Sequence, residues 1–228
     1  MAKSLYNYQK IRDVYKHTDI EHDIRVFVNG GIMYQKRINT LLEEGKGILL
    51  TSAVTQAGIP RGYLLKLVEQ GALEHTGRGV YIRAGGMDDQ LYALQQSAKK
   101  IVYSHETALF FHGLTDRTPF TYSITVPSGY KPSEKLKSGC KIYFIKSDRI
   151  NVGLTKVSSG MGHDITIYDM ERTICDSIRS RSKLDIQIVT DALKRYASRK
   201  DKNLNVLGSY AEQFGIQKLL HHYLEVLL

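Results

Sequence analysis

The chain has little of what secreted, membrane-spanning or zinc-binding proteins require. Only two cysteines occur in 228 residues, Cys140 and Cys175, and neither lies in a Cys-x-x-Cys or Cys/His pattern that holds zinc. No apolar run reaches the roughly 18 residues of a membrane span, and charged residues stand near the N-terminus where a signal peptide is apolar. We therefore expect a cytoplasmic protein in a reducing compartment, with no metal and no membrane contact.

Motifs of metal-dependent catalysis are also incomplete. His105-Glu106 begins like the zinc motif His-Glu-x-x-His, but Leu109 stands where the second histidine is required. His112 falls too far along the same predicted helix to replace it. The two histidines are therefore expected to be helix-end or partly buried residues, not ligands.

A group of acidic residues in the C-terminal half resembles the carboxylates of a nuclease: Asp164, Asp169, Glu171 and Asp176. No basic catalytic partner follows at a matching spacing. Asp169 is instead expected to cap a helix, with Glu171 and Arg172 on its exposed first turn. The sequence thus predicts no catalytic residue, no cofactor and no enzyme activity.

Basic residues outnumber acidic ones. There are 32 Lys and Arg against 23 Asp and Glu, which gives a formal net charge of +9. Such a charge attracts polyanions, and nucleic acid is the commonest polyanion in a cell. Because the basic residues are spread over both halves, a solvated mixed-charge surface explains them nearly as well. The positions of particular basic residues must therefore decide between nucleic-acid binding and an ordinary solvated surface.

Residues 34–85 show the pattern of a winged helix-turn-helix domain. The expected elements are helices over 34–44, 51–56 and 60–70, followed by strands over 72–75 and 80–83. A Thr51 or Ser52 cap begins the second helix, and Pro60 opens the third. The glycine-rich segment 76–79 joins the strands as the wing.

One face of the third helix is expected to meet DNA. Taking Leu64, Leu67 and Val68 as buried, a rotation of about 100° per residue turns the opposite positions outward. The predicted DNA-binding residues are Arg61, Gly62, Tyr63, Lys66, Gln70 and, at the wing tip, Arg78. Lys66 and Gln70 can hydrogen-bond to base edges, and Gly62 permits close approach of the backbone to DNA. Arg61, near the start of the helix, can reach a phosphate or a guanine. Arg78 suits a narrow minor groove.

Residues 1–33 precede this domain as an N-terminal extension of undecided role. Apolar residues first recur at helical spacing from Leu5 to Tyr15. Ile24, Val26 and Val28 then alternate like a short strand before the break at Asn29-Gly30-Gly31.

Residues 86–228 are expected to form a mixed α+β domain after Gly85-Gly86. The predicted strands cover 122–126, 141–146, 155–157 and 165–168, and helices precede and follow them. Six basic residues are expected to make accessory phosphate contacts: Lys141, Lys146, Arg149, Lys156, Arg179 and Arg181. The overall expectation is an α+β chain, with a winged helix-turn-helix followed by this second domain.

The order of these segments resembles a known family. The winged helix-turn-helix domain is followed by three characteristic segments. They are Ser104-His-Glu-Thr-Ala-Leu-Phe-Phe-His-Gly-Leu114, Tyr122-Ser-Ile-Thr-Val-Pro127 and Ile167-Tyr-Asp-Met-Glu-Arg-Thr-Ile-Cys-Asp176. From about Tyr34 to the C-terminus, the chain resembles the AbiEi antitoxins of abortive-infection toxin–antitoxin systems, which serve bacterial phage defence.

The resemblance implies an antitoxin that represses its own operon by binding inverted repeats in the promoter. It also implies that the C-terminal domain counteracts a partner AbiEii-type nucleotidyltransferase toxin without forming a stable complex with it. Monomer and dimer both stay open, including pairing only on DNA. A winged-helix regulator unrelated to a toxin and a protein-interaction scaffold are the alternatives, and the basic Arg61, Lys66 and Arg78 argue against the scaffold.

Overall fold

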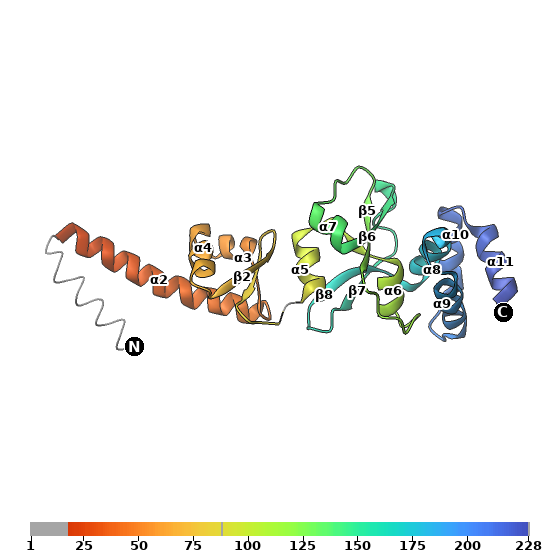
Figure 1. Cartoon of the computed structure of the whole chain (residues 1–228), viewed down its shortest axis with the longest axis horizontal. Helices are drawn as coiled ribbons and strands as arrows, with labels where there is room; N and C mark the ends of the chain where they lie inside the picture. The colour runs from red at the N-terminus through yellow and green to blue at the C-terminus, as the bar shows by residue number, and fades with distance from the viewer. Residues whose placement is uncertain (1–17, 88, 228) are drawn as a thin grey trace. The chain divides into compact units, whose positions relative to one another are not determined.

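The computed structural model describes residues 18–87 and 89–227. The chain divides into two compact units, Met1–Asp88 and Asp89–Leu228, which we call the N-terminal and C-terminal units (Figure 1). Helices and strands occur in both units, so the predicted α+β class is confirmed.

From residue 18 to residue 87, the N-terminal unit contains three helices and a three-stranded sheet. In order they are α2 (Thr18–Glu44), β1 (Ile48–Leu50), α3 (Thr51–Gln56), α4 (Arg61–Glu69), β2 (Leu73–Gly77) and β3 (Val80–Arg83). The sheet has the order β1-β3-β2 and is antiparallel throughout. This arrangement is the predicted winged helix-turn-helix, with the β2–β3 hairpin as the wing.

Apolar side chains from all three helices and the sheet make one core in this unit. It consists of Ile38, Leu42, Leu49, Val54, Ile59, Leu64, Leu67 and Leu73. The turn between α3 and α4 passes through Gly58 with φ of 71°, a conformation that glycine adopts without strain. The Ile59 N–H then donates to the Val54 carbonyl at 3.1 Å, which closes the turn. Neither Thr51 nor Ser52 is the cap of α3, because Thr51 is already its first residue and Leu50 precedes it.

The strand predicted over Ile24–Val28 is wrong, because α2 is helical from Thr18 to Glu44. A glycine in a helix costs only about 1 kcal/mol, so Gly30 and Gly31 do not stop a helix that is anchored by packing further along. The apolar pattern predicted from Leu5 to Tyr15 lies outside the described residues.

The C-terminal unit combines a mixed sheet with helices. Its strands are β4 (Val102–Tyr103), β5 (Tyr122–Pro127), β6 (Cys140–Ile145), β7 (Leu154–Ser158) and β8 (Asp164–Tyr168). Its helices are α5 (Gln90–Ser97), α6 (His105–Phe111), α7 (Glu134–Gly139), α8 (Met170–Arg179), α9 (Ile186–Ser198), α10 (Leu204–Gln213) and α11 (Gln217–Leu227), with short 3-10 turns η1 (Ser147–Arg149) and η2 (Arg181–Lys183).

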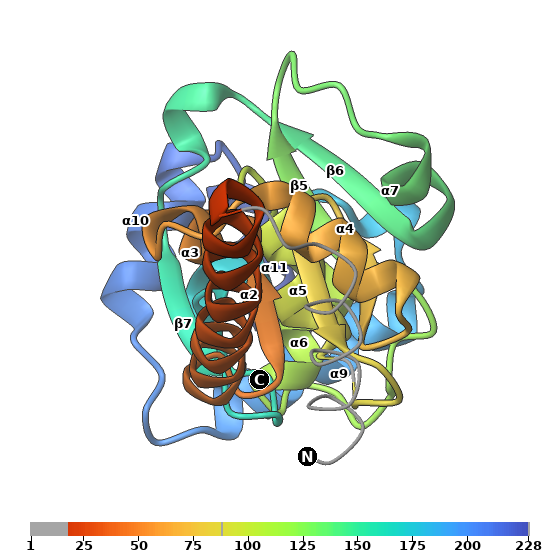
Figure 2. The same cartoon turned by 90° about the vertical axis from the view of Figure 1, so that its left-hand side faces the viewer.

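The sheet of this unit has the strand order β6-β5-β4-β8-β7. β5 and β6 are parallel, as are β4 and β8, whereas β4 pairs with β5 and β7 with β8 in antiparallel fashion. Figure 2 shows β5 and β6 side by side, with α7 leading into β6. The four predicted strands are confirmed to within two residues, while the two-residue β4 and the short α7 were not predicted.

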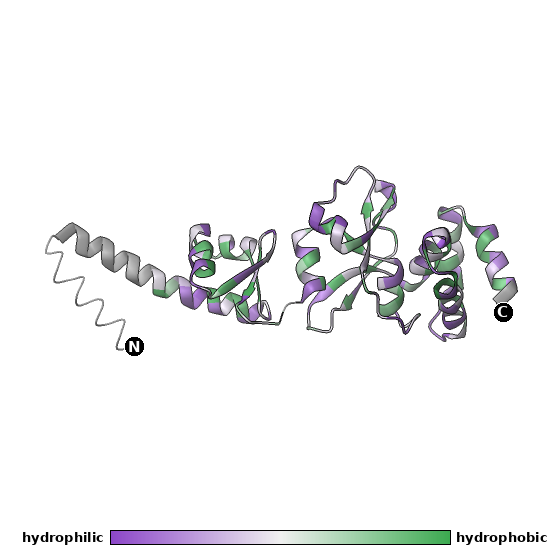
Figure 3. Cartoon of the chain, viewed as in Figure 1, coloured by the Kyte–Doolittle hydropathy of each residue, from purple (hydrophilic) through white to green (hydrophobic). Residues whose placement is uncertain are grey.

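Two apolar clusters stabilise the C-terminal unit. One joins the sheet to α5 and α6 through Ile101, Tyr103, Ala108, Ile124 and Ile167. The other holds α8–α11 together around Ile174, Ile178, Leu193, Tyr196 and Leu207. Figure 3 shows hydrophobic and hydrophilic residues alternating along α9, α10 and α11, as expected when each of these helices buries one face.

Helix α8 is the exception, because it is buried from Met170 to Ile178. The Asp169 carboxylate accepts from the Arg172 N–H at 2.7 Å, so its predicted capping role is confirmed. The prediction that Glu171 and Arg172 are exposed is wrong, since they are 8% and 0% exposed. Helices α6, α9, α10 and α11 all pack against α8, so even its polar residues are enclosed.

Candidate nucleic-acid interface

Helix α4 presents a mixed polar and apolar face to solvent. Leu64 and Leu67 are buried, at 1% and 3% exposure. At about 100° per residue, the direction opposite to them passes through Gly62 and Glu69, with Leu65 and Lys66 on either side. All four are exposed, as are Arg61 at the start of the helix and Gln70 after its end. The solvent face of α4 thus consists of Gly62, Leu65, Lys66 and Glu69, flanked by Arg61 and Gln70.

Tyr63 does not lie on this face, contrary to the prediction. Its ring packs edge-on against Tyr34 of α2, with centroids 5.5 Å apart, and its hydroxyl lies 3.1 Å from both the Gly31 carbonyl and Gln35 Oε1. Burial raises the pKa of this hydroxyl. Tyr63 falls on the flank of α4 that faces α2, and a large ring there gains more from packing than from solvent.

Gly62 has no structural reason to be glycine. A Cβ added there meets nothing within 4 Å, and the residue has an ordinary helical backbone without positive φ. Glycine in a helix is about 1 kcal/mol less favourable than alanine, so the fold alone would favour a side chain here. The position therefore stands open for close approach by another molecule.

Leu65 was not among the predicted site residues, yet it is 60% exposed on the solvent face of α4. The signal was present in the sequence. Leu64, Leu65, Leu67 and Val68 stand within five consecutive residues of α4, and one helix does not bury all of them against a single core face.

Arg78 lies at the tip of the wing, between β2 and β3, and is exposed. Gly79 beside it has φ of 72°, and a Cβ there would lie 3.4 Å from the Thr51 Oγ1. His75 and Tyr81 pair across β2 and β3, and their ring centroids lie 4.9 Å apart, so the two rings pack together and stabilise the hairpin. The wing is therefore a packed hairpin with the exposed Arg78 at its tip.

The six basic residues predicted as accessory contacts separate into two groups. Lys146, Lys156 and Arg181 are exposed. Lys141, Arg149 and Arg179 are less exposed and contact charged or aromatic side chains of the C-terminal unit. Lys141 Nζ lies 3.2 Å from Glu106 and donates to the Lys183 carbonyl at 2.8 Å. Arg179 pairs with Asp176 at 3.0 Å.

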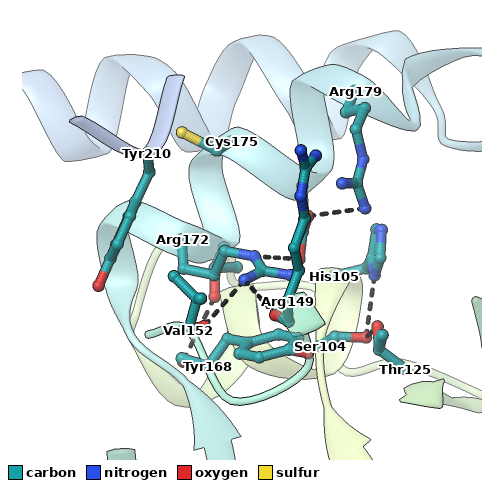
Figure 4. A network of polar contacts seen from close by, with 12 residues as sticks. Ser104, His105, Thr125, Arg149, Val152, Tyr168, Arg172, Cys175, Arg179 and Tyr210 are labelled. Atoms are coloured by element: carbon teal, nitrogen blue, oxygen red, sulfur yellow. Dashed lines mark hydrogen bonds and ion pairs between the residues drawn. The ribbon is translucent and has the colours of Figure 1, made fainter. Parts of the chain in front are cut away.

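Buried Arg172 is the centre of the polar network in Figure 4. Its guanidinium lies 4.2 Å from the Tyr168 ring centroid and 4.1 Å from that of Phe214. Its Nε donates to Asp176 at 2.9 Å, and its Nη1 donates to the carbonyls of Val152 and Arg149 at 2.8 and 3.3 Å (Figure 4). Burial raises the pKa of Asp176 against the opposing effect of the two arginines. The network ties α8 to the η1–β7 loop.

His105 lies beside this network at the start of α6. It is fully buried, has φ of 45°, and stacks on Tyr143 with centroids 3.4 Å apart. Its ring nitrogens lie 2.9 Å from Ser104 Oγ and 3.0 Å from Ser180 Oγ. Burial, reinforced by Arg179 and Lys141, holds the pKa of His105 well below its ordinary value, so the ring is neutral. Ser104 uses its hydroxyl here and makes no capping bond to α6.

Within residues 18–87 and 89–227, no group of three or more His, Cys, Asp or Glu side chains is arranged to hold a metal ion. In the same residues, no helix is long and apolar enough to cross a membrane.

Comparison with known families supports the assignment of the N-terminal unit. Residues 36–84 match a family described as "Transcriptional regulator, AbiEi antitoxin". The predicted resemblance to the AbiEi antitoxins is confirmed. The match extends from the second half of α2 to the end of the wing, and so includes α4 and Arg78.

One solved structure with a similar fold is that of the RV2827C protein from Mycobacterium tuberculosis, with a TM-score of 0.55. The two sequences are 14% identical, and the similarity covers 79% of this chain and 71% of that one. At this identity the likeness concerns the fold. No sequence among the curated proteins matches this chain significantly.

Proposed function

We propose that the chain is a cytoplasmic AbiEi-type antitoxin and autorepressor that binds inverted repeats in its own promoter. The observation that carries this proposal is the solvent face of α4. Arg61 and Lys66 supply cations, Gly62 leaves room for close approach, and the Arg78 wing stands in the same unit. This combination suits a helix in the major groove and a wing on the neighbouring backbone or minor groove.

Each contact has a distinct expected role. Lys66 and Gln70 meet base edges, Arg61 meets a phosphate or a guanine, and Arg78 enters a narrow minor groove. Tyr63 is left out of this set because its hydroxyl and ring bind α2. The exposed Lys146, Lys156 and Arg181 are the accessory phosphate contacts that we retain.

The C-terminal unit is proposed to carry the antitoxin activity against an AbiEii-type nucleotidyltransferase toxin, without catalysis, without a cofactor and without a stable complex. The support is the antitoxin family matched by residues 36–84. The chain is proposed to be a monomer or a dimer in solution, with two copies bound to the two halves of the operator. Two copies are needed because each half of an inverted repeat binds one winged helix-turn-helix domain.

Footprinting of the full chain on its own upstream DNA tests this proposal. We expect two protected half-sites in inverted orientation, and weaker protection by the Lys66→Ala variant. Lys200→Ala, which removes one exposed charge from the C-terminal unit, is the matched control and should protect like the wild type. Weak retention on every DNA, with no protected site, would favour a protein-interaction scaffold.

A further inference from the structure

We propose that Leu65 contacts the 5-methyl group of a thymine in the operator and makes α4 select thymine at that position. The inference rests on the proposed operator binding and adds which base the helix selects. It starts from Leu65, an apolar side chain that is 60% exposed on the proposed DNA-binding face.

The position of Leu65 follows from the burial of its neighbours. Leu64 and Leu67 point into the core, which turns Gly62 and Glu69 directly away from it. Leu65 and Lys66 lie about 50° to either side of that direction, at 100° per residue. A groove that receives Lys66 therefore receives Leu65 at the same depth.

The direction of the side chain places its methyl groups near the start of α4. In helices a leucine side chain leans toward the N-terminus, over the residues three and four positions earlier. For Leu65 these positions are Gly62 and Arg61. A Cβ at Gly62 would meet no atom within 4 Å, and Leu65 is itself 60% exposed, so a ligand has room to reach Leu65 beside the first turn of α4. The N-terminal part of a recognition helix is the part that meets base edges.

The chemistry of the major groove offers one partner for such a group. Thymine carries a 5-methyl group there, whereas guanine, adenine and cytosine present hydrogen-bonding atoms and no methyl group. Burying Leu65 against a methyl group removes apolar surface from water, while burying it against a cytosine amine would leave that donor unpaired. The flanking Lys66 and Glu69 suit guanine and cytosine, so Leu65 adds a distinct preference on the same helix.

Uracil interference on the upstream DNA tests the inference with the full chain. Thymines are replaced at random by deoxyuridine, which removes only the methyl group, and bound and free DNA are compared position by position. For the wild type we expect one thymine in each half-site where the replacement weakens binding about three- to fivefold, the effect of one buried methyl group. Leu65→Ala should bind both forms equally at that position.

Two further variants separate this role from general weakening. Leu65→Met keeps an apolar side chain of similar volume and should keep the thymine preference. Lys66→Ala should bind more weakly overall yet keep the same uracil-sensitive thymine. An unchanged interference pattern in Leu65→Ala would overturn the inference while operator binding stands. A wild type that shows no preferred site at all would overturn the proposed function as well. A Leu65→Ala variant that changes the oligomeric state but not the pattern would assign Leu65 to self-association instead.

Discussion

At the scale of single residues, Gly62 is the position where folding and the proposed DNA binding make opposite demands. Replacing it with alanine should raise the free energy of unfolding by up to about 1 kcal/mol, because the site is helical and open. The same methyl group should weaken operator binding by about 1 to 3 kcal/mol, the usual cost of forcing an extra methyl group into a closely packed contact, because it holds the helix away from the groove. Urea denaturation and a DNA titration measure the two effects.

Gly208 provides a matched control for this variant. It lies inside α10, is exposed, and a Cβ there also meets nothing within 4 Å. Gly208→Ala should stabilise the protein to a similar extent and leave DNA affinity unchanged. If Gly62→Ala keeps full operator affinity, α4 does not approach DNA through its first turn.

His105 predicts how stability depends on pH. Its pKa is lowered well below 6.5 in the folded protein, chiefly by burial, while the unfolded chain keeps the ordinary value. Below about pH 6.5 the unfolded chain therefore binds a proton that the folded protein does not, so stability is full above that pH and falls as the pH decreases. Between pH 7.5 and 5.5 the loss from this residue should be on the order of 1 kcal/mol.

The variant His105→Asn isolates this effect. Asparagine accepts the positive φ of the site and does not titrate. It should be less stable than the wild type at pH 7.5, because the stack on Tyr143 is lost, but its free energy of unfolding should fall less toward pH 5.5. Equal pH dependence in both proteins would show that His105 is not the titrating group.

At the scale of elements, α8 depends on the pairing of Arg172. Arg172→Met should lower the free energy of unfolding by about 3 to 5 kcal/mol, because Asp176 loses a buried partner and the η1–β7 loop loses two hydrogen bonds. Adding Asp176→Asn should recover part of that loss, since it removes the buried carboxylate, while Arg179, the other partner of Asp176, is partly exposed and can be hydrated. Urea denaturation of both variants measures this, and a loss below about 1 kcal/mol for Arg172→Met would contradict a structural role for the network.

The elements also show what the sequence was able to predict. Apolar alternation predicted β5–β8 because each of these strands has at least five residues, whereas β4 has two and gives no pattern. Periodicity located the buried face of α4, but it treated Tyr63 as outward because that residue stands on the boundary of the face. The burial of Arg172 was not predictable in this way. Its partners Arg149 and Val152 lie on a loop 20 or more residues earlier and approach α8 only in the folded sheet.

At the scale of the whole molecule, we propose that the two units divide the work. A fragment from Met87 to Leu228 should fold, since its clusters contain only residues of its own unit, and it should counteract the toxin while losing operator binding. Circular dichroism checks the fold, and rescue of cells that express the toxin checks the activity. Rescue by the N-terminal unit but not by a folded Met87–Leu228 fragment would reverse the roles.

The central claim, that α4 reads a specific operator, is tested most directly by one titration at fixed salt. Fluorescence anisotropy compares the full chain and Lys66→Ala on the native upstream duplex and on a scrambled duplex of equal length. We expect the wild type to prefer the native duplex by at least about a thousandfold. Lys66→Ala should lose about 1 to 3 kcal/mol of affinity for the native duplex and much less for the scrambled one. Equal wild-type affinity for both duplexes would contradict the account.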